Sequence, residues 1–143
     1  MLENVSPLCY DDSISRTKEI KMTSQCALIL TASDELFAKS FEIGESYEML
    51  REGVGGWLEL VRLNNGVDMW VNDNGIAENL PYNPSATAIY WSNFGFMSGQ
   101  IFGDVVFTSS NSEGDTTGLT VGQLEYLNLI CFDIVGLKIK TLA

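Results

Sequence analysis

The amino-acid sequence predicts a single α+β domain, built on a twisted, mainly antiparallel sheet of about five strands with two or three helices packed on one face. The chain has 143 residues, of which 45% are hydrophobic and 19% charged, and this suits one domain with its own core. Strand-like runs recur along it and are joined by short turns that contain asparagine or glycine. Residues that favour helix starts precede several of the remaining segments.

The first residues differ from the rest of the chain. Residues 1–22 are polar and mixed in pattern, and three of the eight cations of the chain, Arg16, Lys18 and Lys21, lie among them. We therefore expect an N-terminal arm or extension over residues 1–22. The single α+β domain is expected to span residues 23–143.

Two apolar runs predict the first strands of the domain. Residues 26–31 and 36–43 are separated by a turn at 32–35. A helix is predicted from Ser46 to Glu52, with Ser46 as its N-cap. The glycines that follow can adopt the left-handed conformation that ends a helix.

The clearest local signal is a β-hairpin. Residues 57–63 and 67–71 are predicted strands joined by Asn64-Asn65-Gly66. Asparagine and glycine supply the positive φ angles that a tight hairpin turn requires. Alternation along the second strand places Val67, Met69 and Val71 on one face and Asp68 and Trp70 on the other.

The second half of the chain continues the alternation of helices and strands. After a turn at 73–75, Asn83-Pro84 is typical of a helix start. The asparagine side chain can accept a hydrogen bond from the first turn, and proline has no backbone N–H that would need a partner there. This helix is predicted to run from Pro84 to Trp91. A strand is expected at residues 101–108.

A polar loop and a final helix complete the predicted domain. Residues 109–118 form the loop, and Thr120 and Gln123 have the spacing of a capping box. The tail alternates apolar and lysine residues over 137–140, which is typical of an edge strand. The helix after the capping box has an apolar stripe of Val121, Leu124, Leu127 and Cys131.

Charge excludes several kinds of function. The net charge is −11, the chain contains no histidine, and no lysine or arginine lies between Arg62 and Lys138, a stretch with eight acidic residues. Such a surface repels nucleic acid and anionic membranes and attracts basic partners. The absence of histidine removes the commonest general base, and the sequence has no serine-nucleophile motif or phosphate loop. We therefore expect no enzyme, no nucleic-acid partner and no membrane partner.

Metals, cofactors and membrane segments are not expected either. The three cysteines, Cys9, Cys26 and Cys131, form no CxxC pair, so a zinc site is not predicted, and nothing indicates another cofactor. No apolar run reaches the length of a membrane span, and the first residues lack the apolar core of a signal peptide. We expect a cytoplasmic protein, located in the host cytoplasm if a phage encodes it.

Several motifs in a fixed order resemble a known family. They are Leu50-Arg-Glu-Gly-Val-Gly-Gly-Trp-Leu-Glu-Leu60, Trp70-Val-Asn-Asp-Asn-Gly75, Leu80-Pro-Tyr-Asn-Pro84, Gly103-Asp-Val-Val-Phe-Thr108 and Glu113-Gly-Asp-Thr-Thr-Gly-Leu-Thr-Val-Gly-Gln123. Together, over about residues 43–123, they resemble the small family of phage and bacterial proteins named domain of unknown function 3846. The resemblance implies a compact α+β domain found in phage and mobile-element genomes. It implies no activity and carries over no catalytic residues.

An aromatic segment is the first candidate for partner binding. Tyr90, Trp91, Phe94 and Phe96 lie close together near glycines, in what we expect to be partly a loop. Burial in the core is the simpler interpretation of aromatic residues. Exposure of at least two of them would instead create a rigid apolar patch suited to a protein partner.

Two acidic residues are the second candidate. Glu113 and Asp115 lie in the polar loop 109–118. Two carboxylates are too few for a calcium site. The loop is therefore expected either to be simply solvated or to contact a basic partner.

Three functional hypotheses follow from these features. The first is a small acidic phage-type accessory protein that acts by non-enzymatic binding and inhibits a host protein with a basic surface, such as a defence or nucleic-acid-handling protein. The second is a sponge for a small signalling nucleotide, whose base would stack on aromatic residues. The third is an oligomeric structural or interaction module, possible as a homo-oligomer through strand exchange.

Overall fold

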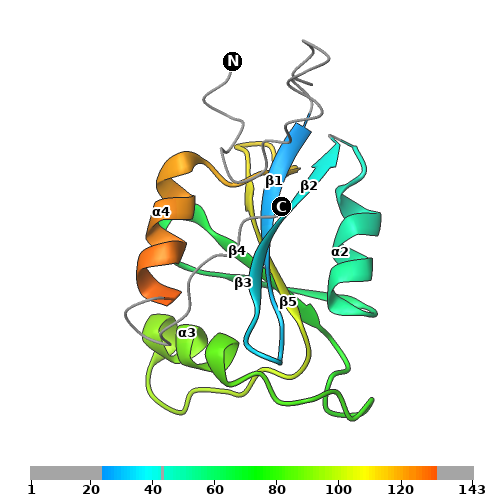
Figure 1. Ribbon diagram of the computed structural model, residues 1–143, viewed down its shortest axis with the longest axis vertical. Coiled ribbons are helices and arrows are strands. Elements are labelled where there is room, and N and C mark those ends of the chain that lie inside the picture. Colours follow the sequence, from blue (N-terminus) through cyan, green and yellow to red (C-terminus); the bar gives the residue numbers. More distant parts are fainter. Residues whose placement is uncertain (1–23, 43, 132–143) are drawn as a thin grey trace.

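The computed structural model describes residues 24–42 and 44–131. Expectations for residues 1–22 and for the strand at 137–140 lie outside these residues. The described elements form an α+β arrangement of a mostly antiparallel sheet and three α-helices, as the sequence predicts (Figure 1). They are β1 (Ser24–Leu30), β2 (Leu36–Glu42), α2 (Ser46–Val54), β3 (Leu58–Arg62), β4 (Asp68–Asn72), α3 (Pro84–Phe94), β5 (Val105–Ser110), β6 (Thr116–Thr117) and α4 (Val121–Ile130).

Strand β5 lies at the centre of the sheet, whose order is β2-β1-β5-β4-β3 with β6 paired to the far end of β5. The hairpins β1–β2 and β3–β4 flank it, and every pairing is antiparallel. Phe107 is paired with Leu28 on one side and with Met69 on the other, and all three side chains are buried. The two halves of the sheet are therefore joined only through β5 among the described strands.

The β3–β4 turn has the backbone that its residues predict. Asn65 has φ 63° and Gly66 has φ 72°, so both residues adopt the left-handed conformation. The N–H of Leu63 donates to the carbonyl of Val67 at 2.8 Å and closes the hairpin. Val67, Met69 and Val71 are all buried, which agrees with the prediction that they share one face.

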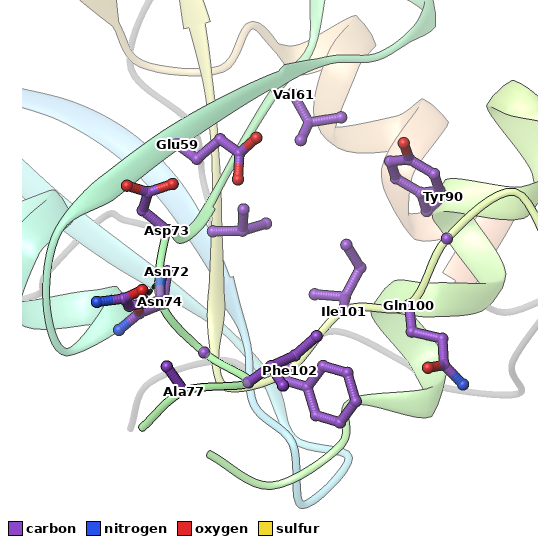
Figure 2. A pocket seen from close by; sticks show the side chains of 14 residues that line it. Glu59, Val61, Asn72, Asp73, Asn74, Ala77, Tyr90, Gln100, Ile101 and Phe102 are labelled. Atoms are coloured by element: carbon purple, nitrogen blue, oxygen red, sulfur yellow. Dashed lines mark hydrogen bonds between the residues drawn. The ribbon is translucent and has the colours of Figure 1, made fainter. Parts of the chain in front are cut away.

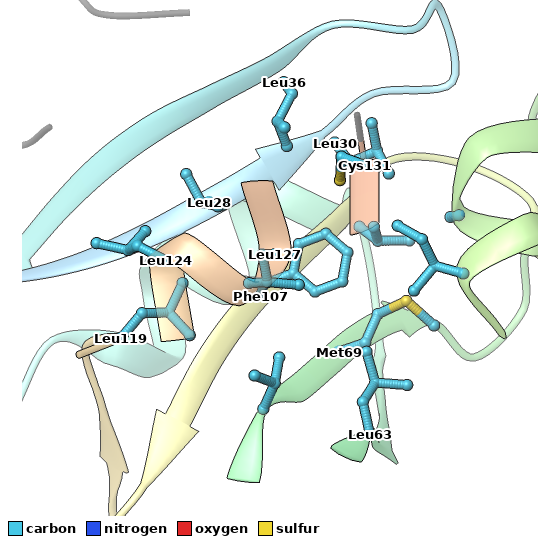
Figure 3. Packing of buried hydrophobic residues seen from close by; sticks show 14 of the residues in the cluster. Leu28, Leu30, Leu36, Leu63, Met69, Phe107, Leu119, Leu124, Leu127 and Cys131 are labelled. Carbon is cyan, nitrogen blue, oxygen red and sulfur yellow. The ribbon is translucent and has the colours of Figure 1, made fainter. Parts of the chain in front are cut away.

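The larger core lies between the sheet and the helices α3 and α4 (Figure 3). Phe107 and Met69 from the sheet pack in one cluster with Ile89 of α3 and with Leu124 and Leu127 of α4. Cys131 is buried in the same cluster, whereas Val121 is exposed and does not belong to the predicted stripe. Two helices on one face agree with the prediction.

The third helix, α2, packs on the opposite face, so the helices are not all on one side (Figure 1). Met49 and Leu50 of α2 are buried against Ala27, Ile29 and Val106. The reason is that the central strands are apolar at consecutive positions, as a strand covered on both faces must be. A helix on the second face removes this surface from water.

Local capping chemistry sets two of the three helix starts. The Asn83 side chain accepts from the N–H of Ala86 at the start of α3, and Thr120 and Gln123 form the predicted capping box of α4. At α2 the expected cap is wrong, because Ser46 is already helical and Glu45 is the N-cap without a side-chain bond. Within the described residues, no helix has the length and apolar character needed to cross a bilayer.

Candidate functional site

A groove of about 480 Å³ lies between the β3 edge of the sheet and α3 (Figure 2). Its floor is apolar and includes Val61 of β3, Val71 of β4 and Ile101 from the segment before β5. Tyr90 of α3 and Phe102 contribute aromatic rings to the lining. The groove is therefore a place where an apolar or aromatic surface is accessible beside the sheet.

Two carboxylates lie on one wall of this groove. Glu59 and Asp73 are both exposed, and Figure 2 shows them on one side of the groove with Tyr90 and Gln100 on the other. The β3–β4 register explains their proximity, because Glu59 is paired with Val71, two residues before Asp73. Among the described residues that line the groove, Glu59 and Asp73 are the charged ones, so the lining carries net negative charge.

The turn after β4 holds this wall in place. The buried Asn72 donates through Nδ2 to the carbonyl of Val54 and to Glu78 Oε1, both at 3.3 Å, and its Oδ1 accepts from the N–H of Asn74 at 2.7 Å. The predicted turn at 73–75 is thus present, tied to the end of α2. Gly75 allows close packing, since a Cβ there would lie 3.0 Å from the carbonyl oxygen of Phe102.

The aromatic residues predicted for partner binding lie at the C-terminal end of α3 and just beyond it. Phe94 is 49% exposed and Phe96 is 82% exposed, so the simpler interpretation, burial in the core, is wrong for these two, whereas Tyr90 and Trp91 are half-buried. Tyr90 and Phe94 have ring centroids 4.7 Å apart, and Trp91 and Phe96 have theirs 5.1 Å apart. Three of the four are helical, because α3 continues past Trp91 to Phe94.

The aromatic group connects to the groove through two contacts. Tyr90 lines the groove directly. Trp91 Nε1 donates to the carbonyl of Gly99, which also lines the groove. Glycine at position 99 allows this close approach, because a Cβ there would lie 3.1 Å from the Tyr90 ring. Phe94 does not line the groove itself, but its ring contacts the Tyr90 ring, so the exposed aromatic group adjoins the groove at Tyr90.

The acidic pair predicted for partner binding lies elsewhere. Glu113 and Asp115 are exposed in the turn between β5 and β6, where both backbone N–H groups donate to Asn111 Oδ1 at 2.9 Å. Figure 1 shows this turn at the upper end of the molecule and α3 with its following loop at the lower end. The structure does not bring the two predicted groups together. The acidic residues that line the same groove as Tyr90 are instead Glu59 and Asp73.

A second accessible surface, around Arg51, is not predicted from the sequence. The Arg51 guanidinium of α2 lies 4.4 Å from the Trp57 ring centroid and 5.9 Å from that of Tyr47, and these rings are 60% and 55% exposed. Arg51 Nε also donates to the carbonyl of Gly56 at 3.3 Å. Tyr47 and Arg51 are four residues apart on a helix, a spacing that brings side chains together and could have indicated the pair.

One buried acid lies away from the groove. Asp68 of β4 is buried, and the pKa of its carboxyl is raised by burial, an effect that the Arg62 charge and a hydrogen bond from Ser110 only partly oppose. Beside it, Trp70 Nε1 donates to Thr108 Oγ1 at 2.8 Å. These side chains belong to the face covered by α2, so Asp68 does not contribute to the groove.

The polar and aromatic groups that line the groove suit the binding of cations. Among the described side chains, no group of three or more Cys, Asp or Glu is placed to hold a metal ion. Without histidine in the chain, the groove offers carboxylates, amides and aromatic faces. Such groups accept hydrogen bonds from ammonium and guanidinium groups, and aromatic faces attract them.

Comparison with known proteins identifies the family but no individual relative. No curated protein and no solved structure matches the chain. A family model covers residues 26–130, a longer span than the resemblance seen in the motifs and nearly all of the described sheet and helices. The chain therefore belongs to the family described as domain of unknown function (DUF3846).

Proposed function

We propose that this protein is a non-enzymatic binding domain whose groove receives a basic segment of another protein. One observation carries the proposal: Glu59 and Asp73 share a wall of an accessible groove that no described cation lines. A lysine or arginine entering this groove gains two carboxylate acceptors and can approach the Tyr90 ring. The net charge of −11 favours rapid encounter with a basic partner.

The concrete form of this function is inhibition. We propose a small phage-type accessory protein that works in the host cytoplasm and occupies a basic surface of a host defence or nucleic-acid-handling protein. Carboxylates would then fill positions that phosphates occupy in the normal complex. Phe94 and Phe96 would add apolar contacts at the end of the groove, since aromatic residues are common among the residues that dominate protein interfaces.

The alternative functions have less support. A nucleotide sponge needs cations for the phosphates, and the described lining of the groove has none. Arg51 lies near the Tyr47 and Trp57 rings, so this surface offers both a cation for a phosphate and rings for stacking. Glu48 and Glu52 line the same surface, however, and would repel a phosphate. An oligomeric module would have a solution mass that is a multiple of the 15.8 kDa of one chain.

A binding measurement with matched peptides tests the proposal. The probe is an octapeptide that alternates lysine and valine, with its glutamate–valine counterpart as the negative control, titrated by calorimetry. The double variant Glu59→Gln/Asp73→Asn should bind the lysine peptide about tenfold more weakly, since each exposed ion pair contributes up to about 1 kcal/mol. The matched control Glu113→Gln/Asp115→Asn loses the same charge at the far turn and should bind like the parent.

Two results would contradict the proposal. The first is the absence of lysine-peptide binding to the parent protein. The second is equal weakening in the two double variants, because the net charge alone would then explain the attraction. Added salt should weaken the parent interaction in either case, so salt dependence by itself decides nothing.

A further inference from the structure

We infer that the partner segment binds as an extended strand added antiparallel to β3, with basic side chains toward Glu59 and Asp73 and apolar side chains on the other face. The charge of this partner rests on the proposed function, whereas the mode of binding is a separate claim. Strand addition obtains its affinity from main-chain hydrogen bonds and its specificity from alternate side chains. The edge, the backbone phase and the two faces of β3 each support it.

Strand β3 is one edge of the sheet. It pairs with β4 over Leu58–Arg62, and no other described strand lies on its far side. The opposite edge, β2, carries the exposed Lys39 in its middle, and lysine is a residue that natural proteins use to discourage pairing at an edge. Between its ends β3 has no cation, and the groove lies directly beside it. Of the two edges that the described strands leave, β3 is therefore the one without a central lysine to discourage pairing.

The hydrogen-bond phase shows which groups of β3 point outward. The N–H of Leu63 donates to Val67 at one end of the hairpin, and the N–H of Asp73 donates to the carbonyl of Trp57 at the other. Bonded and non-bonded pairs alternate in an antiparallel ladder. Residues 59 and 61 therefore direct their N–H and C=O groups toward β4, as residues 57 and 63 do. Leu58, Leu60 and Arg62 direct theirs to the open edge.

The two faces of β3 define the side chains that an added strand requires. Glu59 and Val61 face the groove, whereas Leu58 packs with the apolar cluster under α2 on the other face. A residue directly opposite Glu59 in an added strand lies within reach of its carboxylate. The residues opposite Leu58 and Leu60 continue an apolar face. The occupant is thus a segment that alternates basic and apolar residues.

This arrangement makes a backbone-specific prediction. In the added strand, the residue bonded to Leu60 shares its face, so the apolar residues direct their N–H groups toward β3 and the basic residues direct theirs away. In the lysine–valine octapeptide, N-methylation of the valines should weaken binding about tenfold or more, because it removes main-chain donors to β3. N-methylation of the lysines should leave the affinity within about threefold of the parent peptide.

Variants of the protein test the same claim from the other side. Leu60→Pro removes the outward N–H without touching the ladder to β4, and proline is tolerated at such edge positions. It should weaken binding about tenfold, while the matched Leu60→Ala keeps the N–H and should lose less. The affinities are measured by NMR titration of the full chain, which also maps the site. Signals of residues 58–62 should shift, and those of the turn at 111–115 should not. If Leu60→Pro does not fold, the N-methylated peptides still decide.

A peptide of four lysines followed by four valines separates this inference from the proposed function. It has the same composition as the alternating peptide but cannot present lysine on one face only, so it should bind more weakly. If it binds equally well, or if the two N-methylated peptides behave alike, strand addition is overturned while a basic ligand in the groove still stands. If Glu59→Gln/Asp73→Asn also has no effect, both fail. A doubled solution mass through β3, with no peptide binding, would identify a second copy as the occupant and overturn the inference.

Discussion

Replacing Asn83 with alanine should destabilise the protein far more than an ordinary helix cap does. Its Oδ1 caps α3 at Ala86, and its Nδ2 donates to the carbonyls of Leu30 at 3.2 Å and Gly103 at 2.9 Å. The side chain is fully buried, so it joins the end of β1, the start of α3 and the segment before β5. Loss of the cap costs about 1 kcal/mol, and loss of two buried hydrogen bonds about 1 kcal/mol each. The expected total is about 3 kcal/mol.

Thr120 provides the matched comparison. It caps α4 through the same kind of bond, from Gln123 N to Thr120 Oγ1, but it is exposed and makes no bridge to the sheet. Thr120→Ala should therefore cost about 1 kcal/mol. Asn83→Ser keeps a capping oxygen without the two donors and should fall between the two variants. Urea unfolding followed by tryptophan fluorescence measures all three, with unchanged m-values if unfolding stays two-state. If Asn83→Ala costs no more than Thr120→Ala, the bridging role assigned to Asn83 is wrong.

Two further sets of substitutions test the packing and the buried charge. Burial raises the pKa of Asp68 above its ordinary 3.8, so the folded state retains the proton to higher pH than the unfolded chain does. As the pH rises from the unfolded pKa through the folded pKa, ionisation of Asp68 therefore destabilises the fold. Asp68→Asn should therefore gain stability relative to the parent between about pH 3 and pH 7 in urea titrations, and a constant or falling difference would contradict this. Gly118→Ala should lose about 1–3 kcal/mol, because its Cβ would lie 2.5 Å from the backbone nitrogen of Cys26. Gly122→Ala, in α4 with only Thr120 Oγ1 nearby at 3.9 Å, should gain about 0.5 kcal/mol, and thermal unfolding should separate the pair in opposite directions.

Local chemistry made much of the fold predictable. The positive φ angles at Asn65 and Gly66, the cap at Asn83 and the capping box at Thr120 are each determined by residues within a few positions of one another. The predicted end of α3 at Trp91 is too early, because the helix continues to Phe94 and Gly95 is its C-cap. Periodicity is a weak guide there, because α3 is apolar on much of its surface and carries aromatic residues at its end.

The groove depends on distant parts of the chain, and this explains why the sequence did not reveal it. Its walls come from the β3–β4 hairpin and from residues 99–102, which meet through the contact between Gly75 and Phe102. Nothing local distinguishes Glu59 and Asp73 from the other acids. Only the register of the β3–β4 hairpin places these two carboxylates close together. Their proximity could have been predicted from the sequence once the length of the hairpin turn was known. Glu113 and Asp115 lie in the loop that follows the C-terminal end of β5, whereas the aromatic residues precede its start, so the length of this strand separates the two groups.

The central position of β5 has a consequence for synthesis on the ribosome. Both of its neighbours, β1 and β4, precede it in the chain, so two separate hairpins emerge first and remain unjoined until residues 105–110 leave the exit tunnel. During that interval each hairpin exposes an apolar inner edge, and long-range pairing of this kind is slow. The nascent chain should therefore be most vulnerable to aggregation and to chaperone capture just before β5 appears, and the vulnerability should end abruptly once it inserts.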